Sequence, residues 1–308
     1  MKLFAGIDGG QSGTQAVIAD ETGDILGRGN AGPCDEVGES KTSSKAHEAL
    51  NAAMHAALAD AGLPTTTRME CIVAGISGYD GAFVGRAPKL ATKRFVPVHD
   101  APVAHVAAFG GASGIVVIAG TGSVVLGVVD EREPVLVGGW SSQFGDEGGA
   151  YWIGREAIRQ TMACEDAGVA PDSVARVALR AFAAKSAREI VAKVSAGKIA
   201  RCDIAALAKP ILALAARNET DAVALVDEAI EYLLDDALLT LERLEVPTSD
   251  IAFVGGLMRN RWYAQRVQML VDELDGRFSL VAPAHDPAVG ALLMAYTYAE
   301  VPLPPRVA

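Results

Sequence analysis

Three glycine-rich turns, each next to an apolar segment, are the first residues in this sequence that could do chemistry. The first reads DGGQSGT at residues 8–14, the second reads GTGS at 120–123, and the third is the pair Gly255 and Gly256. Residues without a Cβ let backbone N–H groups approach anionic oxygens closely, so such turns can hold phosphate. Asp8 opens the first turn at a strand end, where a carboxylate could bind Mg²⁺. Taken alone, the first turn would equally suit a glycine-rich hairpin with a solvated Asp.

The segments around the first turn predict a hairpin and not a strand that enters a helix. Residues 3–7 form an apolar run, and residues 14–19 form a second strand-like segment. A Rossmann site or a P-loop needs glycines that open a helix whose N-terminus holds the phosphate. The hairpin pattern recurs at residues 115–129, around the second turn. The repeat predicts a duplicated fold, with two related lobes that face each other across a cleft.

A carboxylate also stands at the end of another predicted strand. Residues 95–98 form a short apolar strand that delivers His99 and Asp100 to the start of a helix over 101–109. The carboxyl end of a strand is a common location for active-site groups in α/β proteins. For Asp100 alone, the N-cap of that helix is the better interpretation, because Asp is favoured there and Pro102 suits the first turn. We expect His99 to be a structural neighbour and not a catalyst.

Length and composition predict a soluble globular protein with two lobes. The chain has 308 residues, of which half are hydrophobic and 21% are charged, which suits two domains with their own cores. The 38 acidic residues outnumber the 27 basic residues, so no basic patch is expected for nucleic acid or an anionic membrane. The longest apolar stretch, at 115–129, contains the second turn and is too short to span a membrane. We therefore expect no nucleic-acid or membrane partner.

The cysteines and the N-terminus indicate in which cellular compartment the protein is expected. The four cysteines have no C-x-x-C pair and no histidines at metal-ligand spacing, which predicts neither a disulfide framework nor a zinc site. The sequence enters a strand directly after Lys2, without the pattern of a signal peptide. We therefore expect reduced thiols and a cytoplasmic location. A Leu/Ala-rich helix is predicted over 220–244, and its apolar stripe suits either core packing or a subunit contact. If the stripe is a subunit contact, we expect a homodimer.

The most specific pattern lies between the second and third turns. Residues 138–154 read GGWSSQFGDEGGAYWIG, which resembles the G-G-W…G-D-E-G-S-x-Y-W-I-G signature of the N-acetylglucosamine kinase and BadF/BadG/BcrA/BcrD ATPase family. The order of the three turns resembles the phosphate-1, phosphate-2 and adenosine motifs of actin-like sugar kinases. The resemblance implies an α/β, two-lobed actin-like ATPase fold (ribonuclease H-like, duplicated) with an interlobe cleft. We expect an N-terminal lobe at 1–112 and a C-terminal lobe at 113–308, with a last helix that can pack back on the N-terminal lobe.

The same resemblance implies an enzyme, an ATP-dependent sugar kinase that uses ATP and Mg²⁺. Asp8 would position the metal, and Asp100 would be the catalytic base that takes the proton of a sugar hydroxyl during phosphoryl transfer. Together with the other motifs, the base is preferred to the helix N-cap as the role of Asp100. The residues that would contact the sugar are Asp35, Asp100, Gly139, Trp140 and Asp146. The residues that would bind ATP and its phosphates are Gly9, Gly10, Gln11, Ser12, Gly13, Thr14, Gly120, Thr121, Gly122, Ser123, Gly255 and Gly256.

Two departures from the family pattern bear on the nucleotide and the sugar. Family members usually read DGGGTKT in the first turn, whereas this chain keeps hydroxyls only at Ser12 and Thr14. Amino-sugar kinases tend to carry Asn where this chain has Asp35, and a carboxylate would favour a cationic amine. We expect N-acetylglucosamine as the first substrate, phosphorylated at its 6-hydroxyl, and free glucosamine as the second.

Two other classes of protein share the superfamily. Activator ATPases of acyl-CoA dehydratases and reductases bridge an iron–sulfur cluster across a dimer and need suitably placed cysteine thiolates. The cysteines of this chain do not sit beside the second turn or a helix start in a cluster pattern: Cys34, Cys71, Cys164 and Cys202. A sugar-sensing regulator would add a DNA-binding segment, for which the chain has neither spare length nor basic charge. The kinase hypothesis is therefore preferred.

Overall fold

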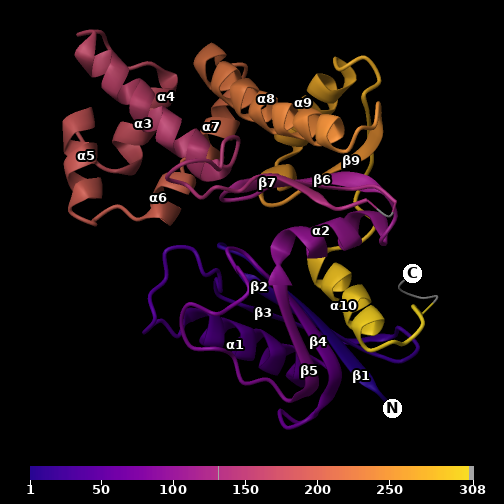
Figure 1. Ribbon diagram of the computed structural model, residues 1–308. Coiled ribbons are helices and arrows are strands. Elements are labelled where there is room, and N and C mark those ends of the chain that lie inside the picture. The colour runs from indigo at the N-terminus through magenta and orange to yellow at the C-terminus, as the bar shows by residue number, and fades with distance from the viewer. Residues whose placement is uncertain (131, 305–308) are drawn as a thin grey trace. The chain divides into compact units, whose positions relative to one another are not determined.

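The computed structural model describes residues 1–130 and 132–304, and the chain forms two compact units (Figure 1). The first unit consists of Met1–Val116 and the segment that begins at Ala282, and the second is Val117–Val281. Within the described residues, no helix is long and apolar enough to cross a membrane. The lobe boundaries expected from the sequence, at 1–112 and 113–308, stay a prediction.

The sheet of the first unit is mixed and has the order β3-β2-β1-β4-β5. Strands β1, β2 and β3 are antiparallel neighbours, whereas β4 runs parallel to β1, and β5 runs parallel to β4. The bounds of the strands are β1 Leu3–Gly9, β2 Thr14–Asp20, β3 Ile25–Ala31, β4 Met69–Ile76 and β5 Thr92–His99. The helices of this unit are α1 Lys45–Asp60, α2 Asp100–Phe109 and α10 Pro287–Tyr298.

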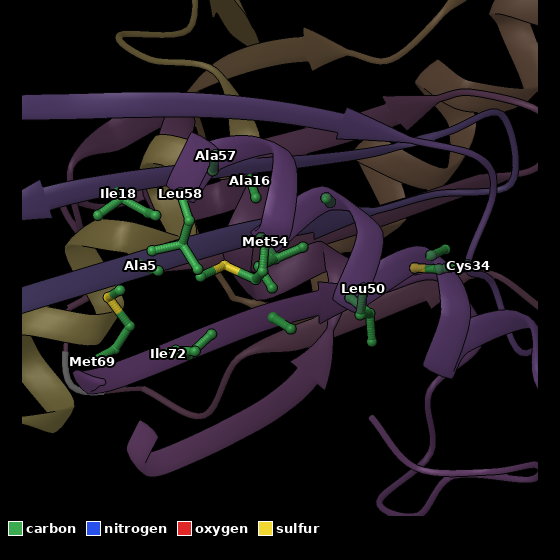
Figure 2. Packing of buried hydrophobic residues seen from close by; sticks show 14 of the residues in the cluster. Ala5, Ala16, Ile18, Cys34, Leu50, Met54, Ala57, Leu58, Met69 and Ile72 are labelled. Carbon is green, nitrogen blue, oxygen red and sulfur yellow. The ribbon is translucent and has the colours of Figure 1, made fainter. Parts of the chain in front are cut away.

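Both faces of this sheet are buried. Successive side chains of a strand point to opposite faces, and β1 shows the alternation clearly. Ala5 and Ile7 belong to the cluster that includes Leu50 of α1 (Figure 2), whereas Phe4 packs on Tyr296 of α10 with ring centroids 4.5 Å apart. The strand is therefore apolar at nearly every position until it reaches Asp8 and the first turn.

The last helix belongs to the first unit. A Cβ on Gly6 would overlap the backbone of Ala288 and Leu292, so the lack of a side chain lets α10 lie directly on β1. The Tyr296 hydroxyl donates a hydrogen bond to the carbonyl of Asp20 (2.6 Å). Helix α10 thus covers the sheet face opposite to α1 and supports the strand that ends in the first turn.

The second sheet repeats the topology of the first. Its order, starting from the β8 edge, is β8-β7-β6-β9-β10, so the third, second, first, fourth and fifth strands follow one another in both sheets. The repeated fold predicted from the recurring turn is therefore confirmed. The strands are β6 Gly114–Ala119, β7 Ser123–Val128, β8 Val135–Gly138, β9 Ser249–Val254 and β10 Phe278–Leu280.

Helices make up most of the second unit. Its longest helix, α8 (Thr220–Arg243), buries its apolar stripe within the unit, including Leu225, Ala229 and Leu233. The stripe is therefore core, and it gives no support to a subunit contact. The other helices are α3 Ala150–Asp166, α4 Ser173–Ala181, α5 Ala187–Ser195, α6 Arg201–Ala205, α7 Ala208–Ala215 and α9 Arg261–Asp272, with a 3₁₀ turn η1 at Leu257–Arg259.

Two local features differ from the sequence prediction. Strand β8 was not predicted, because its buried and exposed residues alternate over only four positions at the edge of the sheet. The alternative interpretation of Asp100 as the helix N-cap is wrong. Asp100 is the first residue of α2, and the N-cap is His99, whose extended backbone (φ −60°, ψ 151°) places its Nδ1 to accept from the Ala101 N–H.

Candidate active site

The first glycine-rich turn joins β1 to β2 as the tight hairpin that the sequence predicted. Gly9 pairs with Thr14, and the N–H of Gly10 donates to the carbonyl of Gly13 (2.9 Å). A Cβ on Gly9 would overlap the Sγ of Cys34, and the Cys34 N–H donates to the carbonyl of Gly10 (3.2 Å). The backbone of the turn is therefore held in place by the loop that follows β3.

The two hydroxyls of the first turn have different roles. The Oγ1 of Thr14 is buried and donates to the carbonyl of Gly32 (2.7 Å), so its proton is used inside the unit. Ser12 is exposed at the tip of the turn, and Gln11 and Gly13 on either side are half-buried. The groups that could meet a phosphate here are the backbone amides of the tip and the Ser12 hydroxyl, and Thr14 serves to fix the hairpin.

Asp8 precedes the turn on β1 and fits the demands of Mg²⁺. Its half-buried side chain adds negative charge near the Cys34 thiol. The pKa of that thiol is raised to about 12 by burial, against a hydrogen bond with Thr14, and the charges of Asp8 and Asp35 add to the rise. Mg²⁺ usually keeps several waters and binds one or two carboxylates together with substrate phosphates. In residues 1–130 and 132–304, no group of three or more His, Cys, Asp or Glu side chains is arranged to hold a metal, so phosphates would have to supply further ligands beside Asp8.

Asp35 lies buried in the loop after β3 and already has a cationic partner. Its Oδ2 accepts from the Nζ of Lys45 (2.6 Å), and the same ammonium donates to Glu39 (3.1 Å). Burial lowers the pKa of Lys45, but its hydrogen bonds to the two carboxylates and their charges outweigh burial and raise it. Lys45 is therefore charged at neutral pH. Asp35, which the sequence predicted to favour a cationic substrate amine, is therefore already paired with Lys45.

Asp100 stands where β5 ends and α2 begins. Its Oδ2 accepts from the Oγ of Ser77 (2.7 Å), the residue that follows β4. Its Oδ1 is buried, lies 3.0 Å from the Nδ1 of His99, and has no hydrogen-bond partner in the described part of the chain when that nitrogen carries no proton. Ser77 thus fixes the Oδ2 of Asp100. The Oδ1 has a donor only when the Nδ1 of His99 carries a proton.

The donors around Asp100 lower its pKa in spite of burial. Burial raises the pKa of Asp100, but the hydrogen bond and charge of His99 together with the hydrogen bond from Ser77 outweigh it. The pKa of His99 is raised, chiefly by the hydrogen bond to Asp100, while burial opposes the rise and the charges of Asp100 and Asp80 add to it. Asp100 is therefore ionised at neutral pH, which is the state that a general base needs.

Ser77 connects the functional groups of the first unit. Its N–H donates to the carbonyl of Gly9 (2.9 Å) in the first turn, and its own carbonyl accepts from the N–H of Glu36 (3.0 Å), next to Asp35. Its hydroxyl donates to Asp100. These contacts follow from the sheet, because β1, β4 and β5 are parallel neighbours whose carboxyl ends meet at one edge. One serine therefore brings together the first glycine-rich turn, the Asp35 loop and the predicted base.

The second glycine-rich turn joins β6 to β7 in the second unit. The N–H of Gly120 donates to the carbonyl of Gly122 (3.0 Å), which closes the turn. The first amides of α3 donate to the turn, from Ala150 to Gly120 and from Tyr151 to Thr121, each at 2.9 Å. The start of α3 is thereby fixed against the turn.

The serine of the second turn corresponds in its role to Thr14 of the first. Ser123 is buried, and its Oγ donates to the carbonyl of Glu147 (2.6 Å). Each turn therefore has one buried hydroxyl that ties it to a following loop. The half-buried Thr121 is the second hydroxyl of this turn.

The third glycine-rich turn packs on the second. Gly255 follows β9 with φ 108°, and a Cβ there would overlap the carbonyl of Ala119 at the end of β6. A side chain is excluded on both grounds, whereas a Cβ on Gly256 would meet open space. The second and third turns are therefore neighbours within the second unit, as a shared nucleotide site requires.

The loop between β8 and α3 presents an exposed tryptophan and a buried carboxylate. Trp140 is 75% exposed, and Gly139 before it has φ 71°, a conformation that favours glycine. The loop closes through the N–H of Gly145, which donates to the carbonyl of Ser141 (2.8 Å). Asp146 follows, buried and with φ 58°. The two predicted sugar contacts of this loop thus differ in environment, since Trp140 faces solvent and Asp146 does not.

Asp146 is held by an arginine from a distant helix. The Nη2 of Arg201, at the start of α6, donates to its Oδ2 (2.9 Å), and the guanidinium lies over the Tyr151 ring at 5.5 Å. A Cβ on Gly122 would overlap this carboxylate, which therefore rests on the second turn. Burial raises the pKa of Asp146, and the nearby Arg201 charge only partly offsets the rise. The carboxylate joins the second glycine-rich turn to the predicted sugar loop.

Sequence reasoning missed three partners of the predicted site residues. Ser77, Lys45 and Arg201 hold Asp100, Asp35 and Asp146, respectively. Lys45 carried a weak signal, because a basic residue at the start of a helix is close in sequence to an acidic loop. Arg201 carried none, since 55 residues separate it from Asp146. The structure brings the site residues together within each unit, at 8–14, 35 and 100 in the first unit and at 120–123, 139–146 and 255–256 in the second.

Comparison with known proteins is consistent with this arrangement. The model of the BadF/BadG/BcrA/BcrD ATPase family matches residues 5–295. An N-acetylmuramic acid/N-acetylglucosamine kinase of Clostridium acetobutylicum is 23% identical over 211 residues, which cover 66% of this chain and 67% of that protein. An N-acetyl-D-glucosamine kinase of Dictyostelium discoideum is 28% identical over 184 residues, which cover 54% of this chain and 56% of that protein.

A solved structure extends the likeness over nearly the whole chain. A protein of Chromobacterium violaceum, provisionally named an N-acetylglucosamine kinase, superposes with a TM-score of 0.78 at 27% identity and covers 96% of this chain and 99% of its own. The predicted α/β, two-lobed actin-like fold is thereby confirmed. The family match spans all three glycine-rich turns and the loop that carries Asp146. The chain is a member of the BadF/BadG/BcrA/BcrD ATPase family.

Proposed function

We propose that the protein is an ATP-dependent kinase that phosphorylates an amino sugar, with N-acetylglucosamine as its first substrate and the 6-hydroxyl as the acceptor. The family match and the names of the similar kinases support the reaction class. The observation within the chain that carries the proposal is Asp100. It is an ionised carboxylate at the end of a strand, with one oxygen fixed by Ser77 and the other lacking a permanent donor.

The proposed chemistry assigns a task to each group. As the sugar oxygen bonds to the γ-phosphorus and the bond to ADP breaks, the hydroxyl proton passes to Asp100. The first turn (Gly9, Gly10, Gln11, Ser12, Gly13 and Thr14) and the second (Gly120, Thr121, Gly122 and Ser123) would stabilise the phosphates. They would do so through amides other than those of Gly10 and Gly120, whose N–H groups close the turns. Asp8 would hold Mg²⁺, which supplies positive charge to the phosphates when bound. Gly255 and Gly256 would lie beside the adenosine.

The sugar contacts favour a neutral N-acetyl group over an ammonium group. Asp35 already shares the charge of Lys45, so a second cation would gain less from it than it would from an unpaired carboxylate. Glucosamine therefore stays the second substrate in the proposal, with less support from Asp35 than the sequence alone indicated. Gly139, Trp140 and Asp146 would contact the ring, with Asp146 held in position by Arg201.

A panel of sugars tests the proposal. ADP release should be measured by a coupled assay with ATP and Mg²⁺, in the presence of N-acetylglucosamine, glucosamine, N-acetylmuramic acid, glucose and no sugar. N-acetylglucosamine should raise the rate most, and mass spectrometry of the product should show one added phosphate. A rate that no amino sugar raises above the rate with ATP alone would exclude the kinase assignment.

The cysteines argue against an activator ATPase. Cys34 and Cys71 are fully buried, and Cys164 is half-buried on α3. The exposed Cys202 lies on α6, away in sequence from the second turn. A cluster shared between two subunits needs thiolates at a surface, which Cys34 and Cys71 do not provide. An iron-containing, oxygen-sensitive preparation would reverse this ranking.

Oligomeric state and compartment complete the proposal. The homodimer stays a prediction without support from α8, whose apolar stripe is core. We keep the cytoplasmic location, and we keep amino sugar and ATP as the partners. Light scattering coupled to size-exclusion chromatography tests the dimer, and a mass of about 32 kDa, equal to that of one chain, would exclude it. Fractionation of cells that express the native protein tests the location.

A further inference from the structure

The Nδ1 of His99 lies between two partners. It is 3.2 Å from the backbone nitrogen of Ala101 and 3.0 Å from the Oδ1 of Asp100. A ring nitrogen without a proton can only accept a hydrogen bond, and one with a proton can only donate. In this one position of the ring, Nδ1 can therefore either accept from Ala101 or donate to Asp100, but it cannot do both at once.

The two hydrogen bonds leave the base in different states. When Nδ1 has no proton, it accepts from Ala101 and caps α2, and the buried Oδ1 of Asp100 has no donor. When Nδ1 carries a proton, it donates to Oδ1, and the Ala101 N–H loses its acceptor. The position of one proton thus decides whether Oδ1 is available to another donor.

The surroundings favour the protonated state. Strand β5 is at the edge of its sheet, so β4 is its only strand neighbour in the described sheet, and the end of β4 brings the neutral Ser77 to Asp100. The charged groups that act on His99 are Asp100 from its own turn and Asp80 from the loop after β4. Both are anions, so in spite of burial His99 binds a proton more tightly than an ordinary histidine.

The ring also has access to water. The His99 side chain is 36% exposed, whereas that of Asp100 is 14% exposed and its Oδ1 is buried. The ring therefore meets solvent, whereas the oxygen beside it does not. A donor that reaches Oδ1 competes with the hydrogen bond from Nδ1.

We propose that His99 is a positioning residue, which holds the Oδ1 of Asp100 in the free enzyme and yields this oxygen to the acceptor hydroxyl of the sugar. The inference rests on the proposed kinase function. When the sugar hydroxyl donates to Oδ1, Nδ1 releases its proton to water and accepts from Ala101. Sugar binding and protonation of His99 therefore compete, and during transfer the hydroxyl proton goes to Asp100.

The test measures how the Michaelis constant for the sugar depends on pH. In the parent enzyme, KM should rise about tenfold for each pH unit below the pKa of His99, with kcat nearly unchanged, because the proton acts as a competitor. The variant His99→Ser keeps a side-chain oxygen that can cap α2 but cannot titrate, so its KM should stay constant over the same pH range. His55→Ser, at an exposed histidine on α1, should keep the profile of the parent.

A second measurement needs no activity. The protein is labelled with ¹⁵N at its five histidines. The ring resonance that is missing from the spectrum of His99→Ser is assigned to His99. Nδ1 should be protonated at low pH, with a pKa above 6.5, and added N-acetylglucosamine should lower that pKa. A pKa unchanged by the sugar, or the same KM profile in parent and His99→Ser, would refute the role of His99. Failure of the kinase assignment would show differently, as an absence of sugar-dependent ADP release at every pH.

Discussion

Asp100 in the first unit and Asp146 in the second are both carboxylates in largely buried surroundings, but their pKa values shift in opposite directions. Asp100 receives a hydrogen bond from Ser77 and, when the Nδ1 of His99 is protonated, a second one from His99, and its pKa is lowered. Asp146 is paired with Arg201, a permanent cation, and its pKa is nevertheless raised. The presence of a cation therefore does not by itself set the protonation state of a buried carboxylate.

The difference lies in how the donors oppose desolvation. At Asp100, two side chains adjoin opposite oxygens, and the sum of their hydrogen bonds and charge exceeds the cost of burial. At Asp146, the guanidinium binds one oxygen, and the neighbouring Glu147 adds a repulsive charge. Asp100 is therefore suited to carry negative charge and accept a proton, whereas Asp146 is suited to hold a position.

The largest expected effect is from Asp100→Asn. The variant keeps the size of the side chain and removes the base, so kcat should fall by about 10²–10⁴-fold. Affinity for ADP, measured by calorimetry, should stay within about twofold, because residue 100 is not among the proposed phosphate-binding residues. A turnover number close to that of the parent would remove Asp100 as the base and would end the comparison with Asp146.

The second effect is from Arg201→Met. Removing the guanidinium leaves Asp146 without its charged partner, and because Arg201 is 25% exposed we expect a loss of about 1–3 kcal/mol in the free energy of unfolding. KM for the sugar should rise as the carboxylate loses its fixed position. Urea unfolding and steady-state kinetics measure the two effects.

Two further variants show whether the Arg201 effect acts through Asp146. Arg201→Lys keeps the charge and should be milder. The double variant Asp146→Asn with Arg201→Met should lose less stability than the sum of the single changes, because the two residues interact directly. Strict additivity would show that the pair seen in the structure contributes nothing to stability.

A smaller effect is expected from Ser77→Ala. The change removes the donor to the Oδ2 of Asp100, and a hydrogen bond to a charged group contributes about 1.5–3 kcal/mol, so kcat should fall roughly tenfold or more. The pKa of Asp100 should rise, so the acidic limb of kcat should move to higher pH. Ser77→Thr retains a hydroxyl and should restore most of the activity. An unchanged pH profile in Ser77→Ala would show that Ser77 does not set the state of Asp100.

These partners also mark the limit of what the sequence could predict. The glycine-rich turns, the hairpin and the strand that delivers Asp100 were predictable, because each is encoded by contiguous residues. Ser77 reaches Asp100 only because β4 and β5 are parallel neighbours, and Arg201 reaches Asp146 only through the packing of α6 on α3. A local pattern can identify a functional carboxylate, but the donors that set its pKa come from other elements.

The smallest effect tests the comparison on a third carboxylate, Asp236 of α8. Its pKa is raised to about 6 by burial and by the charges of Glu147 and Asp235. The folded state therefore binds this proton more tightly than the unfolded state, so the resulting stability is present below about pH 4 and is lost as pH rises through about 6. Asp236→Asn removes the free-energy cost of holding this carboxylate in its charged form at neutral pH.

The stabilisation from Asp236→Asn should be about 1 kcal/mol at pH 7.5, since the carboxylate is only partly buried and solvent reduces the full effect of its pKa shift. The difference from the parent should vanish near pH 4, where both side chains are neutral. Asp235→Asn, at the exposed neighbour, should stabilise less, because it removes only one of the two repulsive charges. Thermal unfolding across this pH range measures all three proteins. A gain that does not depend on pH would assign the effect to packing, and burial with like charges would then not explain the raised pKa of Asp236.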